Sequence, residues 1–205
     1  MTYVLIALIS YLVGSVPFGL IIGRLASGVD VREYGSKRTG ATNVLRTLGP
    51  VYGFSVFLLD LFKGVATVLV ARWLAGGDAW AWALAAIMAV VGHIYPLFAG
   101  FKGGRGVATA LGGVLGMFPL AFGAAFVVWW LAVGLTRYVS LGSILSGIAT
   151  AVTAGIFFAR GESHLAILTY CVVIAVVIIV SHTDNIARLR AGTESKLGQK
   201  VKVGE

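Results

Sequence analysis

Long apolar runs separated by short polar segments make up most of this chain. Runs of about 20 residues recur, and residues 166–180, AILTYCVVIAVVIIV, show no alternation of polar and apolar positions. A helix needs about 20 apolar residues to cross a bilayer, whereas the strands of a membrane barrel alternate in polarity. The pattern therefore predicts an all-α, polytopic integral membrane protein that forms a single domain over residues 1–205.

Seven transmembrane helices are predicted, one of them short. Pro17 is expected to kink the first helix, and Pro50 suits the first turn of the second. The stretch from 107 to 118 has few residues for a full crossing and is also compatible with a re-entrant segment. The predicted spans cover about residues 2–23, 50–75, 79–96, 107–118, 119–136, 139–159 and 164–181.

The distribution of Lys and Arg decides how the short stretch is counted. If it crosses, the N-terminus lies outside, the C-terminus lies in the cytoplasm, and only Arg72 and Arg160 of the 16 basic residues fall outside. Lys63 is then within the membrane. This asymmetry follows the positive-inside rule, so a full crossing is favoured. The residues on the inner side are Arg24, Arg32, Lys37, Arg38, Arg46, Lys102, Arg105, Arg137, Arg188, Arg190, Lys196, Lys200 and Lys202.

Composition agrees with a membrane protein and points to anionic partners. Hydrophobic residues make up 59% of the chain and charged residues 12%, against about 25% charged in soluble domains. The net charge of +8 favours anionic substrates or lipid headgroups. Nucleic acid is not expected, because the basic residues lie at membrane borders. Cys171 is the only cysteine and lies in an apolar run, which excludes an intrachain disulfide.

Three polar segments at the ends of apolar runs carry most of the positive charge. They are residues 35–46 (GSKRTGATNVLR), 92–109 (GHIYPLFAGFKGGRGVAT) and 182–196 (HTDNIARLRAGTESK). Each combines Lys or Arg with Gly, Ser, Thr, Asn or His. Cations supply charge to a phosphate and glycines let backbone N–H groups approach it. If the three segments face one side of the membrane, we expect them to converge on a phosphate-handling site.

In the first segment, Ser36, Thr42 and Asn43 offer polar groups and Arg46 offers charge. Lys37 and Arg38 are interpreted as residues of a solvated cytoplasmic loop. In the second segment, residues 102–106 precede a helix, whose N-terminal N–H groups attract phosphate. Together with Arg46 they are expected to line one anion site, and the members of the run are Lys102, Gly103, Gly104, Arg105 and Gly106. His93 is equally compatible with a buried, hydrogen-bonded residue and with a reactive one.

In the third segment, His182, Asn185 and Leu189 share one face if the helix continues. His182 titrates near neutral pH, so it is a candidate base or anion donor, and a histidine at the headgroup border is the alternative. Glu194 and Lys196 lie beyond the helix stop expected at residue 192 and are also candidate ligand contacts.

Two further polar features lie inside the predicted spans. Asp60 and Lys63 are three residues apart, so they can pair on one helical face, and a structural ion pair is at least as plausible as a functional one. Ser143 is a lone hydroxyl that either contacts a ligand or bonds its own helix. Neither the spacing of the three histidines nor any other pattern predicts a metal site.

The three segments in this order, with LLDLFKG at 58–64, resemble the PlsY family of bacterial membrane acyltransferases. The resemblance covers essentially the whole chain. It implies transfer of an acyl group from acyl phosphate to glycerol 3-phosphate, giving lysophosphatidic acid, without cofactor or metal. It also implies a bacterial plasma membrane location, cytoplasmic motifs and a functional monomer. The candidate catalytic residues are His182, Asn185 and Arg46, and the candidate phosphate-binding residues add Ser36, Thr42, Asn43, Lys102, Gly103, Gly104, Arg105, Gly106, Ser143, Glu194 and Lys196.

Two other classes of function remain open from the sequence. One is a secondary transporter of an organic phosphate, although no inverted repeat is recognisable and the polar groups cluster at one face. The other is a non-catalytic lipid-binding scaffold, in which the basic residues only face headgroups. Polar side chains converging in a cavity would count against the scaffold.

Overall fold

The computed structural model describes residues 1–199, and every regular element among them is a helix. The helices begin and end close to the predicted bounds, so the all-α class is confirmed. The elements in order are α1 Thr2–Gly14, α2 Phe18–Ser27, η1 Val31–Glu33, α3 Ala41–Leu48, α4 Pro50–Ala75, α5 Ala79–Ile94, η2 Leu97–Ala99, α6 Val107–Met117, α7 Pro119–Thr136, α8 Val139–Ala159, α9 Leu165–Ser181 and α10 Thr183–Arg190.

Five segments among these residues are long and apolar enough to cross a membrane: α1 with α2, α4, α5, α7 and α8. A sixth candidate is α9 with α10, a pair bent by 58°. The remaining predicted span is α6, which is apolar but has only 11 residues. All seven predicted segments are therefore helices, while the number that cross and their orientation stay predictions.

The helix of the first span is interrupted at residues 15–17, although α1 and α2 still form one apolar segment from Thr2 to Ser27. Pro17 lacks an N–H and separates α1 from α2, which frees the carbonyl groups at the break. Lys63 of α4 donates a hydrogen bond from Nζ to the carbonyl of Val16 at 3.1 Å. A carbonyl left without a helical partner needs such a donor, above all in a segment predicted to lie in the membrane. The interruption of the helix predicted at Pro17 is confirmed, within a segment that remains one candidate span.

Helices α4 and α6 approach each other at backbone distance. A Cβ on Gly112 would collide with the carbonyl of Leu61, and a Cβ on Gly116 would press on the side chain of Val68. Gly64 of α4 meets α6 from the other side. Small residues permit such close packing of membrane helices. The Gly112–Gly116 pair therefore serves packing within the chain, as expected.

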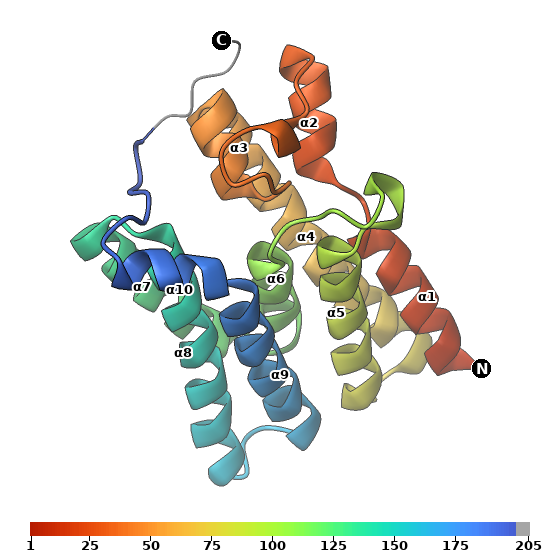
Figure 1. The fold of residues 1–205 in the computed structure, drawn as a ribbon. Coiled ribbons are helices and arrows are strands. Elements are labelled where there is room, and N and C mark those ends of the chain that lie inside the picture. Colours follow the sequence, from red (N-terminus) through yellow and green to blue (C-terminus); the bar gives the residue numbers. More distant parts are fainter. Residues whose placement is uncertain (200–205) are drawn as a thin grey trace.

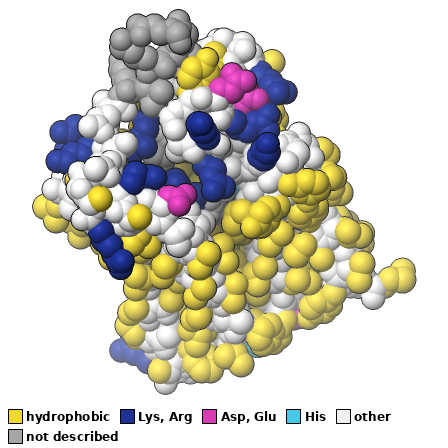
Figure 2. All heavy atoms as spheres, viewed as in Figure 1, with side chains coloured by type: hydrophobic (Ala, Val, Ile, Leu, Met, Phe, Trp, Pro, Cys, Tyr) yellow, Lys and Arg dark blue, Asp and Glu magenta, His cyan; other side chains and the backbone are white. Residues whose placement is uncertain are grey.

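The helices form two groups whose ends meet at one pole of the molecule (Figure 1). Helices α1, α4, α5 and α6 pack together, α7 packs chiefly on α8, and α9 joins the two groups through α5 and α8. Helices α2 and α3 lie at the upper end in this view, and α10 lies lower, across the upper ends of α8 and α9. Lys and Arg side chains gather at that end, whereas the visible flank below is almost wholly hydrophobic (Figure 2). The three polar segments thus lie at one end of the bundle.

Candidate functional site

Two adjoining cavities lie at the basic end of the bundle. The first, the apolar cavity, has a volume of about 390 Å³ and an aromatic wall from α4 and α7. The second, the basic cavity, has a volume of about 650 Å³. The two share four lining residues: Ser36, Arg38, Arg46 and Arg105. The aromatic wall consists of Phe54, Phe57, Phe122, Phe126, Trp129 and Trp130.

The basic cavity holds five cations and one carboxylate, Asp184. Its basic residues come from all three polar segments and are Lys37, Arg38, Arg46, Arg105 and Arg188. Like charges brought together in a concave site repel one another unless an anion joins them. The cavity is therefore suited to bind one or more phosphate groups.

Arg46 lies in the last turn of α3 and reaches the third segment. Its Nη2 donates to the carbonyl of Ser195 at 3.0 Å. Its Nε is buried and has no hydrogen-bond partner among residues 1–199. Burial lowers the pKa of Arg46, and the charge of Glu194 opposes that shift. A buried guanidinium with an unpaired donor favours an anionic ligand in front of it.

Arg105 is held by the end of α9. Its Nε donates to the carbonyl of Ser181 at 3.0 Å. Burial lowers its pKa to about 10, with smaller contributions from the neighbouring cations Arg38 and Arg188. The side chain is still charged at neutral pH, and the unfavourable crowding that lowers its pKa would be relieved by a bound anion.

The third segment does not continue α9 as a straight helix. The chain bends by 58° at His182, so the predicted common face of His182, Asn185 and Leu189 on one continuous helix is wrong. Nδ1 of His182 donates to the carbonyl of Ile178 at 2.8 Å, which leaves Nε2 as an acceptor. Burial, with help from Arg105, lowers the pKa of His182 to about 4. His182 is therefore neutral at pH 7, and its free nitrogen accepts rather than donates hydrogen bonds.

Glu194 is the centre of a buried network and not a phosphate ligand. Its Oε1 accepts from Ser140 Oγ at 2.8 Å and from Asn185 Nδ2 at 2.6 Å, and Oε2 accepts from Arg188 Nε at 2.8 Å. Burial pushes its pKa upward, but these hydrogen bonds outweigh it and hold the pKa below the usual value. Glu194 lines the apolar cavity, yet a carboxylate repels phosphate, so we reassign it from a ligand contact to a residue that positions Asn185 and Arg188.

Asn43 also positions other groups. Its Oδ1 accepts from the backbone N–H of Ser36 at 2.8 Å, and Nδ2 lies within 3.1 Å of the carbonyls of Val31, Tyr34 and Arg38. All of its polar atoms are therefore occupied by backbone, although the residue lines the apolar cavity. The predicted phosphate contact by this side chain is not supported. Instead it holds the loop that presents the 36–38 stretch to both cavities.

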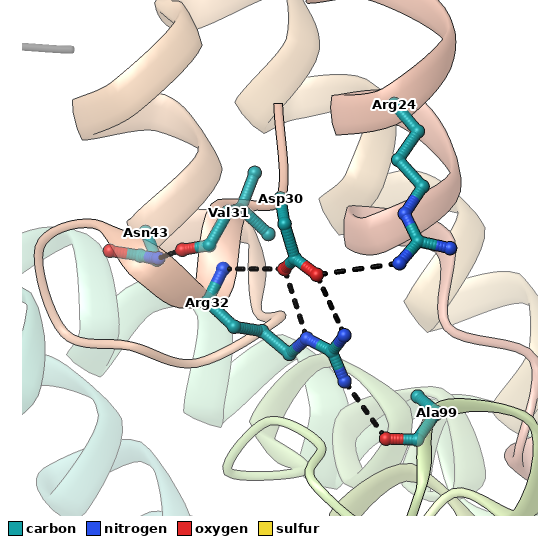
Figure 3. A network of polar contacts seen from close by, with 6 residues as sticks. All are labelled: Arg24, Asp30, Val31, Arg32, Asn43 and Ala99. Carbon is teal, nitrogen blue, oxygen red and sulfur yellow. Dashed lines mark hydrogen bonds and ion pairs between the residues drawn. The ribbon is translucent and has the colours of Figure 1, made fainter. Parts of the chain in front are cut away.

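A second network fastens this loop to the second segment (Figure 3). Arg32 binds the carboxylate of Asp30 through Nε at 2.9 Å and Nη2 at 2.7 Å, and its Nη1 donates to the carbonyl of Ala99 at 2.9 Å. Hydrogen bonds from Arg32 lower the pKa of Asp30 to about 2. Arg24 adds a longer contact to the same carboxylate at 3.4 Å. The pair thus joins the loop after α2 to the loop after α5.

Four predicted contacts lie outside both cavities. Lys102 and Lys196 are exposed, and Lys196 instead sits over the ring of Tyr138 at 5.6 Å. Gly103 and Gly104 pack on the end of α5, where a Cβ would collide with backbone or with a ring. The predicted anion site at residues 102–106 is therefore reduced to its last two members, which do line the apolar cavity. The glycines at 103 and 104 are required for packing.

The remaining predicted residues line a cavity, with one qualification. Thr42 lines the apolar cavity, and its hydroxyl has no hydrogen-bond partner among the described residues. Ser143 lines it too, but its Oγ already donates to the carbonyl of Val139 at 2.9 Å, which is the structural alternative considered above. Arg38, first interpreted as a solvated residue, lines both cavities.

Arg188 lines the basic cavity and was not predicted as a site residue; its contact with Glu194, six residues further on, is shown by the structure. Asp60 and His93, which the sequence left open between structural and functional roles, line the apolar cavity. The predicted pairing of Asp60 with Lys63 is confirmed at 2.7 Å, and His93 is buried beside them.

Comparison with known proteins agrees with the arrangement of these segments. A family model described as glycerol-3-phosphate acyltransferase matches residues 4–192. Curated proteins named glycerol-3-phosphate acyltransferase are similar over most of the chain. The one from Geobacter sulfurreducens is 47% identical over 92% of this chain and 94% of its own. The one from Desulforamulus reducens is 43% identical over 97% of each.

Solved structures show the same fold. A crystal structure of PlsY, an integral membrane glycerol 3-phosphate acyltransferase in its glycerol 3-phosphate form, is 41% identical with a TM-score of 0.88, covering 97% of this chain and 96% of that one. The lysophosphatidic acid form is 40% identical with a TM-score of 0.86, covering 97% of each chain. With its polar segments at one pole and a family match over nearly its whole length, this chain belongs to the PlsY family of integral membrane glycerol-3-phosphate acyltransferases.

Proposed function

We propose that this protein transfers an acyl group from acyl phosphate to the 1-hydroxyl of glycerol 3-phosphate. The products are lysophosphatidic acid and inorganic phosphate, which is the first acylation in bacterial phospholipid synthesis. The names of its relatives support the acceptor and the product, because PlsY is described in a glycerol 3-phosphate form and in a lysophosphatidic acid form. The acyl phosphate donor is our inference from the chemistry of the cavities.

The observation that carries the proposal is the shared boundary of the two cavities. Arg38, Arg46 and Arg105 line both the aromatic-walled cavity and the basic cavity. An acyl phosphate has an apolar chain on one side of its carbonyl and a dianionic head on the other. The apolar cavity suits the chain, and the shared arginines suit the head. The rest of the basic cavity leaves room for the second phosphate, that of the acceptor.

The chain is expected to enter from the membrane. Phe54 on α4 and Trp130 on α7 line the apolar cavity, yet 61% and 55% of their surfaces are exposed on the outside of the bundle. Side chains that face both a cavity and the lipid mark a thin wall or an opening. An acyl chain that passes between α4 and α7 stays in hydrocarbon while its phosphate reaches the arginines.

The reaction needs positioning and charge more than a covalent catalyst. An acyl phosphate is a mixed anhydride, so phosphate is already a good leaving group. The glycerol oxygen forms a bond to the acyl carbon, the bond from that carbon to the phosphate oxygen breaks, and the hydroxyl proton ends on the released inorganic phosphate. Fixed cations at the phosphates and a held acceptor supply most of the acceleration.

His182 is suited to orient the attacking hydroxyl. Its Nδ1 is occupied by the carbonyl of Ile178, and Nε2 is an acceptor on the wall of the apolar cavity. It can accept a hydrogen bond from the glycerol 1-hydroxyl and align a lone pair with the acyl carbon. Asn185, fixed by Glu194, has a buried Oδ1 without a partner among residues 1–199 and lies in the same wall. These two residues therefore serve the acceptor, whereas Arg46 and Arg105 serve the phosphates.

The buried polar network favours an enzyme over a scaffold that only meets headgroups. Glu194, Asn185 and Ser140 converge inside the protein, where no headgroup contact would require them. We further propose seven crossings of the bacterial plasma membrane, with the cavities at the cytoplasmic face and a monomer as the working unit. Lys200 and Lys202, counted in the charge asymmetry, lie outside the described residues.

The proposal is tested by product formation with purified protein in lipid. Acyl phosphate and glycerol 3-phosphate should give lysophosphatidic acid and phosphate in equal amounts, with no requirement for thioester donors. EDTA should leave the rate unchanged, and Cys171→Ala should stay active, because the thiol is buried in α9 and lines neither cavity. A hydroxylamine-sensitive acyl-protein adduct during turnover would refute direct transfer. Uptake of glycerol 3-phosphate into vesicles without acylation would favour a transporter.

A further inference from the structure

A buried polar cluster lies in the wall of the apolar cavity, apart from the residues assigned above. Asp60 and Lys63 on α4 form an ion pair at 2.7 Å, with side chains 2% and 3% exposed. His93 on α5 completes the cluster, and its Nδ1 lies 3.0 Å from Lys63 Nζ and 3.4 Å from Asp60 Oδ1. Buried ionic groups are costly unless they are paired, so this arrangement requires an explanation.

The cluster fixes which nitrogen of His93 carries the proton. The carboxylate at 2.7 Å keeps Lys63 an ammonium, and an ammonium has no lone pair to accept a hydrogen bond. At 3.0 Å, Nδ1 of His93 therefore accepts from Lys63 Nζ. A neutral imidazole whose Nδ1 accepts has its proton on Nε2. Nε2 thus presents a neutral N–H donor.

Nε2 has no acceptor in the described part of the protein, and His93 lines the apolar cavity. The Nε2 atom is not sealed from the surface. Both His93 and Asp60 line the apolar cavity, and neither lines the basic one. Nε2 also lies against the backbone of Gly104, where any side chain would collide with it. The second polar segment therefore leaves room for the imidazole.

We infer that the His93 Nε2–H donates a hydrogen bond to the carbonyl oxygen of the acyl donor, an inference that rests on the function proposed above. The shared arginines hold the phosphate head, and the aromatic wall holds the chain. The carbonyl lies between them, on the side of the apolar cavity that His93 lines. A neutral donor in a dry site suits an oxygen that gains charge only during the reaction.

The step balances without a further reactant. When the glycerol oxygen bonds to the acyl carbon, the carbonyl electron pair moves onto the carbonyl oxygen, where His93 stabilises it. The pair returns as the bond to the phosphate oxygen breaks. The proton on Nε2 stays on His93 throughout. Asp60 and Lys63 do not touch the substrate in this scheme, and their role is to position the ring and to fix its tautomer.

Two substitutions at His93 separate the proposed contact from the buried network. In His93→Asn, the amide oxygen can replace Nδ1 as acceptor for Lys63, but nothing replaces Nε2. In His93→Gln, the longer side chain can return an N–H near the position of Nε2. Loss of one such donor lowers kcat by about 100-fold or more. We expect that loss in the Asn variant with little change in the KM for glycerol 3-phosphate, and partial recovery in the Gln variant.

A pair of unreactive inhibitors tests the contact itself. A 2-oxoalkyl phosphonate retains a carbonyl near the phosphorus, whereas an alkyl phosphate of equal length has none. His93→Asn should weaken inhibition by the phosphonate about 3–10-fold, as expected for one neutral hydrogen bond. It should leave inhibition by the alkyl phosphate unchanged. Equal weakening of both, or of neither, would overturn the inference.

The wild-type protein provides a measurement that does not depend on a variant folding. The chain has three histidines, so ¹⁵N-histidine labelling gives an assignable spectrum. The His93 Nε2–H proton should shift when the 2-oxoalkyl phosphonate binds and not when the alkyl phosphate binds. A resonance that ignores both ligands would refute the contact. Absence of acyl transfer by wild-type protein would instead refute the proposed function, so the two failures are distinguishable.

Discussion

Asn43 gives the sharpest test of whether a conspicuous polar residue beside the arginines binds ligand or builds the loop. The structure gives its side chain four backbone partners, the N–H of Ser36 and the carbonyls of Val31, Tyr34 and Arg38. Asn43→Ala removes all four contacts. Nδ2 has two N–H donors shared among three carbonyls, so the four contacts amount to about three full bonds; at about 1 kcal/mol net each, the free energy of unfolding falls by about 3 kcal/mol. For a chain of this size that is roughly a 10 °C decrease in the unfolding temperature.

The assay is thermal unfolding in detergent, followed by kinetics at a temperature where the variant is folded. Because the loop presents Ser36 and Arg38, a lower kcat is expected together with the lower stability. Thr42→Ala is the matched control. The side chain of Thr42 lies next to Asn43 in the sequence and lines the same cavity without a protein partner among residues 1–199. Loss of the Thr42 hydroxyl should therefore change the KM and leave the unfolding temperature unchanged. An Asn43→Ala protein of normal stability that has lost only its affinity for substrate would show that this reasoning is wrong.

Four further outcomes are expected. The Arg46→Ala protein should fold but lose most of its turnover, because transition-state stabilisation falls by about 2–4 kcal/mol. Near-normal kinetics would show that Arg46 is not part of the site. Lys102→Ala and Lys196→Ala should retain near wild-type kcat, because both residues lie outside the cavities; a large loss would restore them as ligand contacts. The pKa of His182 is lowered to about 4, so its contribution to kcat should be constant from pH 6 to 8 and lost only as pH falls through about 4. Between about pH 6.5 and 4 the unfolded chain binds a proton at His182 that the folded chain does not. The free energy of unfolding should therefore decrease as the pH is lowered through that window, and His182→Gln should abolish that part of the slope. Cysteines placed at positions 37, 102 and 196 of a Cys171→Ala protein should resist impermeant thiol reagents in intact cells, and labelling from outside would contradict the proposed topology.

The spans were predictable because local chemistry sets their ends. Pro50 and Pro119 each occupy the first turn of a helix, and the predicted bounds of α7 and α8 agree with the structure. The break at His182 was not predictable from such signals, because neither proline nor glycine lies near it. There the chain is turned by long-range contacts, among them the bond from Arg105 to the carbonyl of Ser181. A sequence pattern does not contain that information.

The same limit explains which site residues were predicted correctly. Sequence reasoning found the segments that surround the cavities, because basic and small polar residues at membrane borders are unusual. Sequence reasoning did not distinguish the residues that contact the ligand from the residues that hold those contacting residues in place. Asn43 and Glu194 have polar atoms like those of a ligand contact, but their partners are fixed by the fold. Glu194, for example, accepts from Ser140, 54 positions earlier in the chain.

The spacing of Asp60 and Lys63 also bears on how the protein enters the membrane. One lysine or aspartate at the centre of a helix costs about 2.5–3.5 kcal/mol to insert, so two independent charges would be a serious obstacle for α4. The two side chains are three residues apart and pair at 2.7 Å within their own helix. The second span can therefore neutralise itself as it leaves the insertion machinery, before α5 and its histidine have been synthesised. We therefore expect the cluster to be assembled in two stages, first the ion pair within α4 and then its contact with His93 of α5.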